Sequence, residues 1–325
     1  YAKQAPAAFK PISNASCQTC VEQQTILIVP NPADYTVYSN ANGWKFTNIL
    51  GIGSTKEIAG KDDKYTLLAT VTSMNPMECS IKIGNTKPAA NSNAELVIPE
   101  TVTFFEGYNF NVTSIPEDAF KGCNNFVGDL VIPATVKTIG YMAFNASHNS
   151  NAGALIFAEN CELTTIDAWA FNAPFKGNFQ LPTSLTSVGV SAFSNNGEGA
   201  TLTITAGNKG YGRAFSGSKF NKLVVEEGVE SLPGLAFYNT RFTEVVLPLT
   251  LTNIAEGAFD DNTSITTITS NNPVPPTVQV SSNYIAFEQE VFDNATLFVP
   301  DYAAKALYRE ANVWKEFVNI STPII

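Results

Sequence analysis

Short runs of alternating apolar and polar positions recur along the chain, and most of them stop at a proline. Five of these runs are Leu96–Ile98, Leu130–Ile132, Phe179–Leu181, Val245–Leu247 and Leu297–Val299. Alternation over about four positions, with β-branched side chains, predicts a short strand. The proline that follows has no N–H to donate to a ladder, so it ends the strand.

A second apolar group follows most of the predicted strands and closes with an Ala-Phe pair. The pairs end at Phe120, Phe144, Phe171, Phe193, Phe215, Phe237 and Phe259, with steps of 24, 27, 22, 22, 22 and 22 residues. A fixed period in the twenties indicates one short unit that is copied and stacked. We expect each Phe to fill the axis of one coil, and a last irregular unit to end near Phe292.

Two stacked architectures fit this period. One is a leucine-rich-repeat solenoid, and the other is a right-handed parallel β-helix, a fold that many carbohydrate-cleaving enzymes share. Either fold is an array in which each unit is stable only against its neighbours.

The repeat resembles the BspA-like leucine-rich repeat, written loosely as L-x-I-P-x-x-V-x-x-I-x-x-x-A-F. The segments that carry the resemblance are VIPATVKTIGYMAFNAS, LPTSLTSVGVSAFSNN and LPLTLTNIAEGAFDDN. It covers roughly residues 95–320, although ALIFAEN and TLTITAGNKGYG lack the proline. The resemblance implies a surface protein of Bacteroides-type bacteria that contacts host or matrix proteins. The expected fold is a β-rich α/β solenoid, a right-handed array of short parallel strands with a cap at each end.

The expected domain organisation has four parts. Residues 1–60 form an N-terminal segment with a small helix-bearing element, and 61–115 form a β lead-in to the array. The repeats occupy 95–295, and residues 296–325 form a C-terminal cap.

Both ends carry a similar cap sequence. Tyr38 and Tyr308 follow a proline by eight residues, and Trp44 and Trp314 follow the same proline by fourteen. Because the open end of a solenoid exposes its core, a lid is needed there. Asp301 is a good N-cap for a short helix, which we expect to place Leu307 and Trp314 over the last coil.

Charge restricts the partners. The 325 residues carry a net charge of −10 with 19 Lys plus Arg. Nucleic acid is therefore excluded as an expected partner, because phosphate binding needs a basic surface. No apolar run is long enough to insert into a membrane. The polar, Pro-bearing start at Tyr1 looks like a trimmed N-terminus, so we expect an exported monomer at the cell surface or outside the cell, its signal sequence removed.

Residues for catalysis or metal binding are few, and we expect neither a cofactor nor a metal. Cys17 and Cys20 form a C-x-x-C without a second pair, so a local disulfide or two idle thiols is the better interpretation than a zinc site. Cys123 and Cys161 are expected to be buried where repeats turn. The single histidine, His148, lies in a polar stretch that predicts an exposed loop.

The candidate ligand-binding surface is the concave strand face, where outward residues alternate with buried ones. Its outward residues are Asn178, Gln180, Thr201, Thr203, Lys222, Val224, Glu244 and Val246. This mostly uncharged strip suits recognition of a protein or a glycan. Carboxylates on neighbouring turns occur only at Glu95 and Asp129, which gives little support to a glycosidase pair.

The sequence therefore predicts a non-enzymatic surface or secreted module for binding or adhesion, whose partner is an extracellular protein or glycan. Two alternatives remain open. One is a parallel β-helix enzyme that acts on polysaccharide, and the other is an architectural spacer within a larger surface protein.

Overall fold

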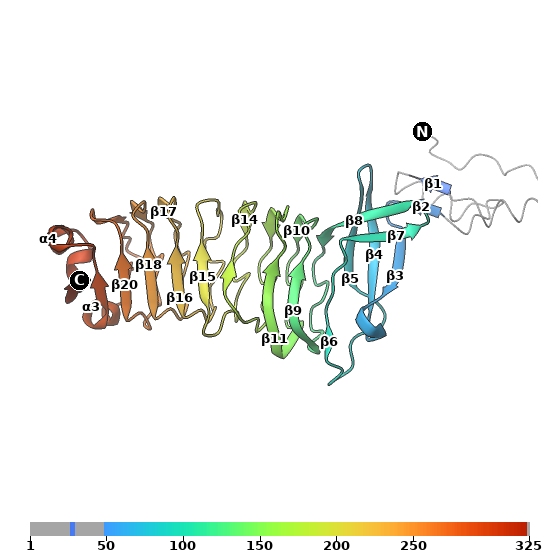
Figure 1. Cartoon of the computed structure of the whole chain (residues 1–325), viewed down its shortest axis with the longest axis horizontal. Helices are drawn as coiled ribbons and strands as arrows, with labels where there is room; N and C mark the ends of the chain where they lie inside the picture. Colours follow the sequence, from blue (N-terminus) through green and yellow to red (C-terminus); the bar gives the residue numbers. More distant parts are fainter. Residues whose placement is uncertain (1–26, 30–48, 324–325) are drawn as a thin grey trace, which may run out of the picture.

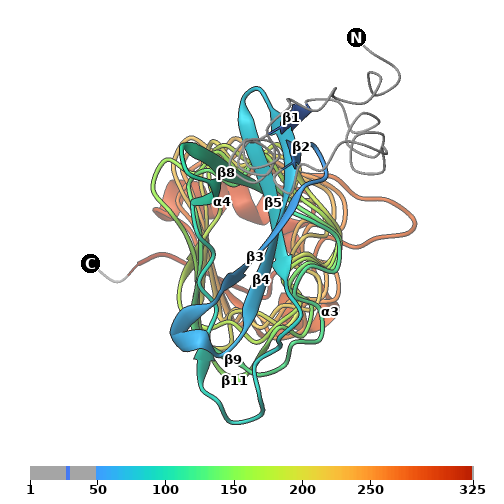
Figure 2. The ribbon, with the colours of Figure 1, turned by 90° about the vertical axis from the view of Figure 1, so that its right-hand side faces the viewer.

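The turns of the chain stack along one axis to form an elongated array, as a computed structural model shows (Figure 1). The structure describes residues 27–29 and 49–323. Seen along the axis, successive turns superimpose around a common interior (Figure 2). The predicted solenoid is therefore confirmed, and its core is the interior of the coil.

The first strand of each repeat turn joins a row of parallel strands. The row begins with β6 (Ala94–Glu95), β9 (Phe126–Ile132) and β11 (His148–Phe157). A longer sheet continues it through β13 (Phe179–Gln180), β15 (Thr201–Ile204), β16 (Lys222–Val225), β18 (Glu244–Leu247), β20 (Thr267–Ser270), β22 (Thr296–Phe298) and β23 (Asn319–Ser321). The predicted alternation holds, since Leu223, Val245 and Ile268 are fully buried.

A second series of strands lies on the return segment of the turns and was not predicted from the sequence. Each member has only two residues: β10 (Thr138–Ile139), β12 (Thr165–Ile166), β14 (Ser187–Val188), β17 (Ser231–Leu232), β19 (Asn253–Ile254) and β21 (Thr277–Val278). The pairing is parallel, as between Ile139 and Ile166. The apolar residues of the return segment, such as Ile139 and Ile166, thus take part in strand pairing as well as filling the core.

The Ala-Phe pairs form the corners that close each turn. Phe144 N donates to Ala170 O at 2.7 Å, and Phe171 N donates to Ala192 O at 2.8 Å, so neighbouring corners are hydrogen-bonded to one another. The residue before each Ala has a positive φ, which turns the chain sharply inward: Asp118, Met142, Trp169, Ser191, Arg213, Leu235 and Gly257.

The Phe rings stack along the axis as predicted. Phe120 and Phe144 have ring centroids 5.1 Å apart with an interplanar angle of 6°, and Phe144 and Phe171 follow at 5.2 Å and 4°. The stack extends to an eighth ring, Phe287, which lies 5.2 Å from Phe259. The last ring of the stack is therefore Phe287 rather than the predicted Phe292, because Phe292 lies beyond it in α3 (Gln289–Asn294).

The N-terminal end of the array is a block of longer, mostly antiparallel strands. β3 (Thr55–Ala59), β4 (Thr66–Met74) and β5 (Met77–Ile83) form a meander, preceded by β2 (Ile49–Gly51), which pairs with β1 (Leu27–Val29). A hairpin of β7 (Thr101–Phe105) and β8 (Tyr108–Ile115) follows. Because β8 pairs with both β5 and β10, the block joins the second series of strands without a gap.

The C-terminal end is closed by α4 (Tyr302–Glu310), η2 (Trp314–Glu316) and β23. Asp301 caps α4 as predicted, since its side chain accepts a hydrogen bond from Ala304 N at 2.8 Å. Trp314 is fully buried and donates through Nε1 to Pro276 O at 2.7 Å. The expectation for Leu307 is wrong: it is 51% exposed, and Tyr308 faces the core instead.

Candidate binding face

The outward residues of the strand row lie in register from turn to turn. Thr201, Lys222, Glu244, Thr267 and Thr296 form one line, and Thr203, Val224, Val246, Thr269 and Phe298 form the next. Gln180 extends the second line as the partner of Thr203. We call the outward side chains of β13 to β22, together with Asn178 just before β13, the strand face. The structure brings the eight predicted residues together on it, but whether they bind a ligand stays a prediction.

The shape of the strand face differs from the expectation. Figures 1 and 2 show the turns in a nearly straight row, so the face is nearly flat rather than concave. The prediction of a concave surface came from the repeat class. The outward and return segments of this chain both carry short parallel strands.

The two charges in the middle of the strand face neutralise each other. Lys222 Nζ lies 2.6 Å from Glu244 Oε1 on the neighbouring strand, and both side chains are partly exposed. Such a surface ion pair stabilises the fold little, at about 0–1 kcal/mol. Its consequence is electrostatic, because the strip from Asn178 to Val246 presents no net charge to a partner.

Asn178 and Gln180 are the most exposed members of the predicted set. The side chain of Asn178 accepts a hydrogen bond from Thr201 N at 3.1 Å and so replaces a missing backbone partner at the start of β15. The side chain of Asp129 accepts a hydrogen bond from Ala154 N at 2.7 Å, at an irregularity in the middle of β11. These two exposed side chains therefore replace backbone partners where the strand pairing is irregular.

The carboxylates Glu95 and Asp129 both line a groove of about 360 Å³ between β6 and β9, and each also makes a structural contact. Glu95 pairs in register with Val127 and not with Asp129, and it forms an ion pair with Lys61. This hydrogen bond to Lys61 lowers the pKa of the Glu95 carboxyl. Each of the two carboxylates thus has a local role in the fold.

His148 is not the exposed loop residue that the sequence predicted. It is 4% exposed, at the start of β11, and its ring lies between those of Phe126 and Phe175 at 5.7 and 4.6 Å. Nδ1 is 2.8 Å from Ser147 Oγ, and Nε2 has no hydrogen-bond partner. Burial lowers the pKa of His148 to about 4, so the ring is neutral at physiological pH.

The cysteine predictions have two outcomes. Cys123 and Cys161 are buried free thiols at the turns, as predicted, and Cys79 is buried in β5. Burial raises the pKa of Cys79 to about 12. Cys17, Cys20, Tyr38 and Trp44 lie outside the described residues. The segment of residues 1–60, in which a helix-bearing element is expected, is described only at 27–29 and from residue 49 onward.

Two further structural results concern metals and membranes. Within residues 49–323 no three His, Cys, Asp or Glu side chains are grouped as a metal site would require. None of the helices in the part of the chain that the structure describes has the length and apolar character needed to cross a bilayer.

One feature of this face was missed from the sequence. The strand row is interrupted between β11 and β13, where the only pairing is a single bridge from Ala154 to Lys176. A groove of about 420 Å³ lies there, with Ile156, Ala158, Gln180 and Thr183 among its lining residues. The available signals were the 27-residue step from Phe144 to Phe171 and the missing proline in ALIFAEN.

Comparison with known proteins gives one family. The model described as the BspA type leucine rich repeat region matches residues 94–210 and 201–297, in 6 copies. No curated protein matches the sequence significantly.

Several solved structures resemble the chain at low identity. A leucine-rich cell surface protein from Faecalibacterium prausnitzii A2-165 is 17% identical, over 82% of this chain and 73% of that one, with a TM-score of 0.43. The leucine-rich repeat protein TpLRR from T. pallidum is 16% identical, over 82% and 95%, with a TM-score of 0.38. The pneumococcal vaccine antigen PcpA is 14% identical, over 84% and 100%, with a TM-score of 0.29.

Proposed function

Because the chain belongs to the BspA-type leucine-rich repeat family, we propose that it is a cell-surface or secreted binding module that recognises an extracellular protein or glycan without catalysis. The observation that carries this proposal is the strand face, where outward side chains stand in register over successive turns. A rigid, repeated surface of this kind suits recognition, because its side chains are positioned before the partner arrives.

The composition of the strand face supports contact with an uncharged surface. Threonine, asparagine and glutamine provide hydrogen bonds, while Val224, Val246 and Phe298 provide partly exposed apolar area. The single ion pair, between Lys222 and Glu244, is internally neutral. Association therefore depends on hydrogen bonds and apolar contact rather than on long-range attraction, and we expect it to depend weakly on salt.

The test is a binding screen of the whole chain against arrays of matrix proteins and glycans, repeated with Gln180→Arg and Thr203→Arg. An arginine at either position adds a charged, bulky group to the middle of the face. Ser187→Arg is the matched control, since Ser187 is an exposed residue of β14 in the second series of strands.

We expect hits for the native chain that both strand-face variants weaken by about tenfold or more, which corresponds to about 1.4 kcal/mol. The Ser187 variant should bind like the native chain. If all three variants still bind the same partners, the binding surface lies outside the strand face. A complete absence of hits would favour an architectural role as a spacer.

A further inference from the structure

The groove between β11 and β13 lies where two sheets of the strand row meet without a ladder between them. A second groove, of about 360 Å³, lies between β6 and β9, beyond their two paired residues. Beside the first groove, Ile156 pairs with Val131 on one side, and Gln180 pairs with Thr203 on the other. Among the residues that the structure describes, no backbone hydrogen bond joins 155–161 to 178–183. The opening is therefore a local separation of two strands within an otherwise continuous row.

The opening is closed at both ends, which makes it a slot. At one end Lys176 N donates to Gly153 O at 2.7 Å. At the other end Ser184 Oγ lies 2.8 Å from the carbonyl oxygens of Cys161 and Leu163. Because these contacts hold the two turns together, the slot is a fixed feature of the fold.

Main-chain groups point into the slot from both walls. Ala158 N donates to Ile132 O, away from the slot, so the alternation of the strand turns the N–H and C=O of Phe157 toward it. On the other wall Leu181 O accepts a hydrogen bond from Asn208 on the far side, so the main-chain groups of Gln180 face the slot. Unpaired strand edges of this kind are templates for another extended chain.

The side chains that line the slot carry no charge. Ile156, which is 40% exposed, and Ala158 provide apolar surface on one wall, and Asn178, Gln180 and Thr183 provide polar groups on the other. A charged ligand would lose hydration in the slot without gaining an opposite charge as a partner, which costs considerable free energy. The lining therefore favours an uncharged ligand.

The lining also disfavours a sugar as the group that enters the slot. Sugar rings are commonly held against an open aromatic face, and the only aromatic side chain in the lining is Phe157. Its ring packs against Phe171 and Phe179, with centroids 6.1 and 5.7 Å away. An extended peptide, by contrast, supplies the alternating donors and acceptors that strand edges need.

We infer that the slot between β11 and β13 holds an extended, uncharged peptide segment of the partner, bound by main-chain hydrogen bonds to the edges at Phe157 and Gln180. The inference rests on the proposed binding function and names both the partner class and the point of contact. The side chains of Ile156 and Asn178 then select which residues of the segment fit.

The experiment is selection of short random peptides from a display library on the whole native chain, with a glycan array as a second arm. Selected peptides are then titrated against Ile156→Arg and against the matched control Val97→Arg. Both positions are outward aliphatic residues of the strand row, 40% and 50% exposed, but Ile156 lines the slot whereas Val97 lines the separate groove between β6 and β9. Both variants should fold, because neither residue is part of the core.

We expect the selected peptides to carry an uncharged central stretch. Ile156→Arg should weaken their binding by about tenfold or more, because it places an unpaired charge in the slot, while Val97→Arg leaves binding unchanged. Hydrogen exchange provides a second readout: the amides of Phe157 and Gln180 should exchange faster than those of β16 in the free chain and become protected when peptide binds.

Other results would overturn the inference in ways that separate it from the proposed function. Peptides or glycans that bind both variants equally, or that are lost only with Thr203→Arg, would leave the chain a binding module with an idle slot. Self-association of the native chain that Ile156→Arg abolishes would make a second copy the occupant. If nothing binds the native chain in either arm, the proposed function fails together with the inference.

Discussion

The Phe residues of the Ala-Phe corners combine two kinds of stabilisation. Each ring is buried, and every ring within the stack lies between two others: Phe237 lies 6.2 Å from Phe215 and 5.4 Å from Phe259. Buried asparagines support the same corners, as when Asn262 Nδ2 donates to Phe237 O at 2.7 Å. A single truncation therefore disturbs three turns of the array.

We expect Phe237→Ala to lower the free energy of unfolding by about 3–5 kcal/mol, since it removes a ring from a packed stack and leaves a cavity. Thr203→Ala, on the strand face, should change it by less than about 0.5 kcal/mol. Urea unfolding followed by circular dichroism measures both. Comparable small losses at the two positions would contradict the observed register.

His148 makes stability depend on pH. Its pKa is about 4 in the folded chain, against an ordinary value of 6.5. The histidine contribution is therefore fully present above pH 6.5 and is lost as the pH falls from 6.5 toward 4, because the unfolded chain takes up the proton first. The loss reaches about 3 kcal/mol, at about 1.36 kcal/mol for each pKa unit.

The measurement is urea unfolding over a pH series for the native chain and for His148→Phe, which preserves a ring between Phe126 and Phe175. Carboxylates titrate in the same range, so the difference between the two chains isolates the histidine. We expect the native chain to lose more stability below pH 6.5 than the variant does. Parallel pH profiles would show that the pKa of His148 is not lowered in the folded chain.

At the scale of the element, the corner of most turns is defined by two residues in the left-handed region. One precedes the Ala-Phe pair, and the other follows the Phe by two positions, as at Gly122, Asn195, Gly217 and Asn239. Glycine and asparagine tolerate a positive φ better than other residues. Ala146 occupies the same second position with φ 51° and is exposed, so it carries strain without a packing role.

Ala146→Asn should raise the free energy of unfolding by about 0.5–1 kcal/mol, because asparagine lowers the cost of the left-handed conformation. Ala146→Val should lower it by a similar amount, since a β-branched side chain tolerates a positive φ poorly. Thermal and urea unfolding of the two variants give the comparison. A gain from valine would mean that the corner adopts another conformation in solution.

The sequence predicts some elements and hides others for physical reasons. The strands of the strand row were predictable because buried and exposed residues alternate within each run. The second series was not, because a two-residue element such as Thr138–Ile139 is too short to show alternation. The burial of His148 was also hidden, since it depends on rings from two other turns. The slot was hidden because it arises where β11 and β13 do not pair, and the absence of strand pairing leaves no pattern of apolar and polar residues.

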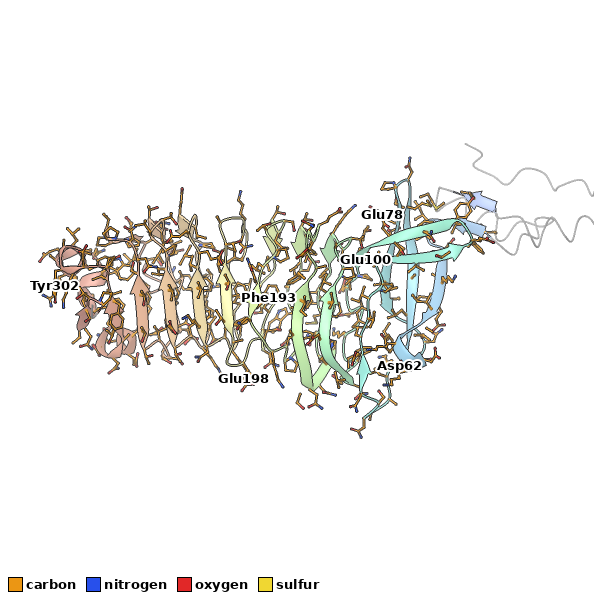
Figure 3. The ribbon with its side chains drawn as sticks, in the orientation of Figure 1. Asp62, Glu78, Glu100, Phe193, Glu198 and Tyr302 are labelled. Carbon is orange, nitrogen blue, oxygen red and sulfur yellow. The ribbon has the colours of Figure 1, made fainter. Side chains whose placement is uncertain are left out.

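At the scale of the whole molecule, the two ends differ in how they cover the core. The N-terminal block continues the second series of strands through β8, whereas at the C-terminal end β23 continues the strand row and aromatic side chains of α4 and η2 cover the core. Tyr308 Oη lies 2.7 Å from Ser270 Oγ, and the Trp314 ring lies 5.9 Å from Phe287, the last ring of the axial stack. Figure 3 shows Tyr302 at the outer end of this cap and Phe193 in the middle of the array.

Trp314→Ala should uncover Phe287 and the end of the axial stack. We expect a loss of about 3–5 kcal/mol for the truncated aromatic residue, concentrated in the last turns of the array, and concentration-dependent association of the exposed ends. Light scattering after size-exclusion chromatography measures the association, and Tyr302→Ala, at an 81% exposed position of the same cap, is the control. Monomeric behaviour of both variants would show that other residues cover the end.

The strand pairing is interrupted once in each of the two series of strands, at different positions along the axis of the array. The strand row opens between β11 and β13, where β10, β12 and β14 continue unbroken, and the second series stops between β14 and β17, where β13, β15 and β16 continue. Within residues 49–323, a tensile load along the long axis therefore still meets one ladder where the other is interrupted. A molecule pulled along this axis, as under fluid shear, is expected to part first at one of these two cross-sections, where a single ladder carries the load.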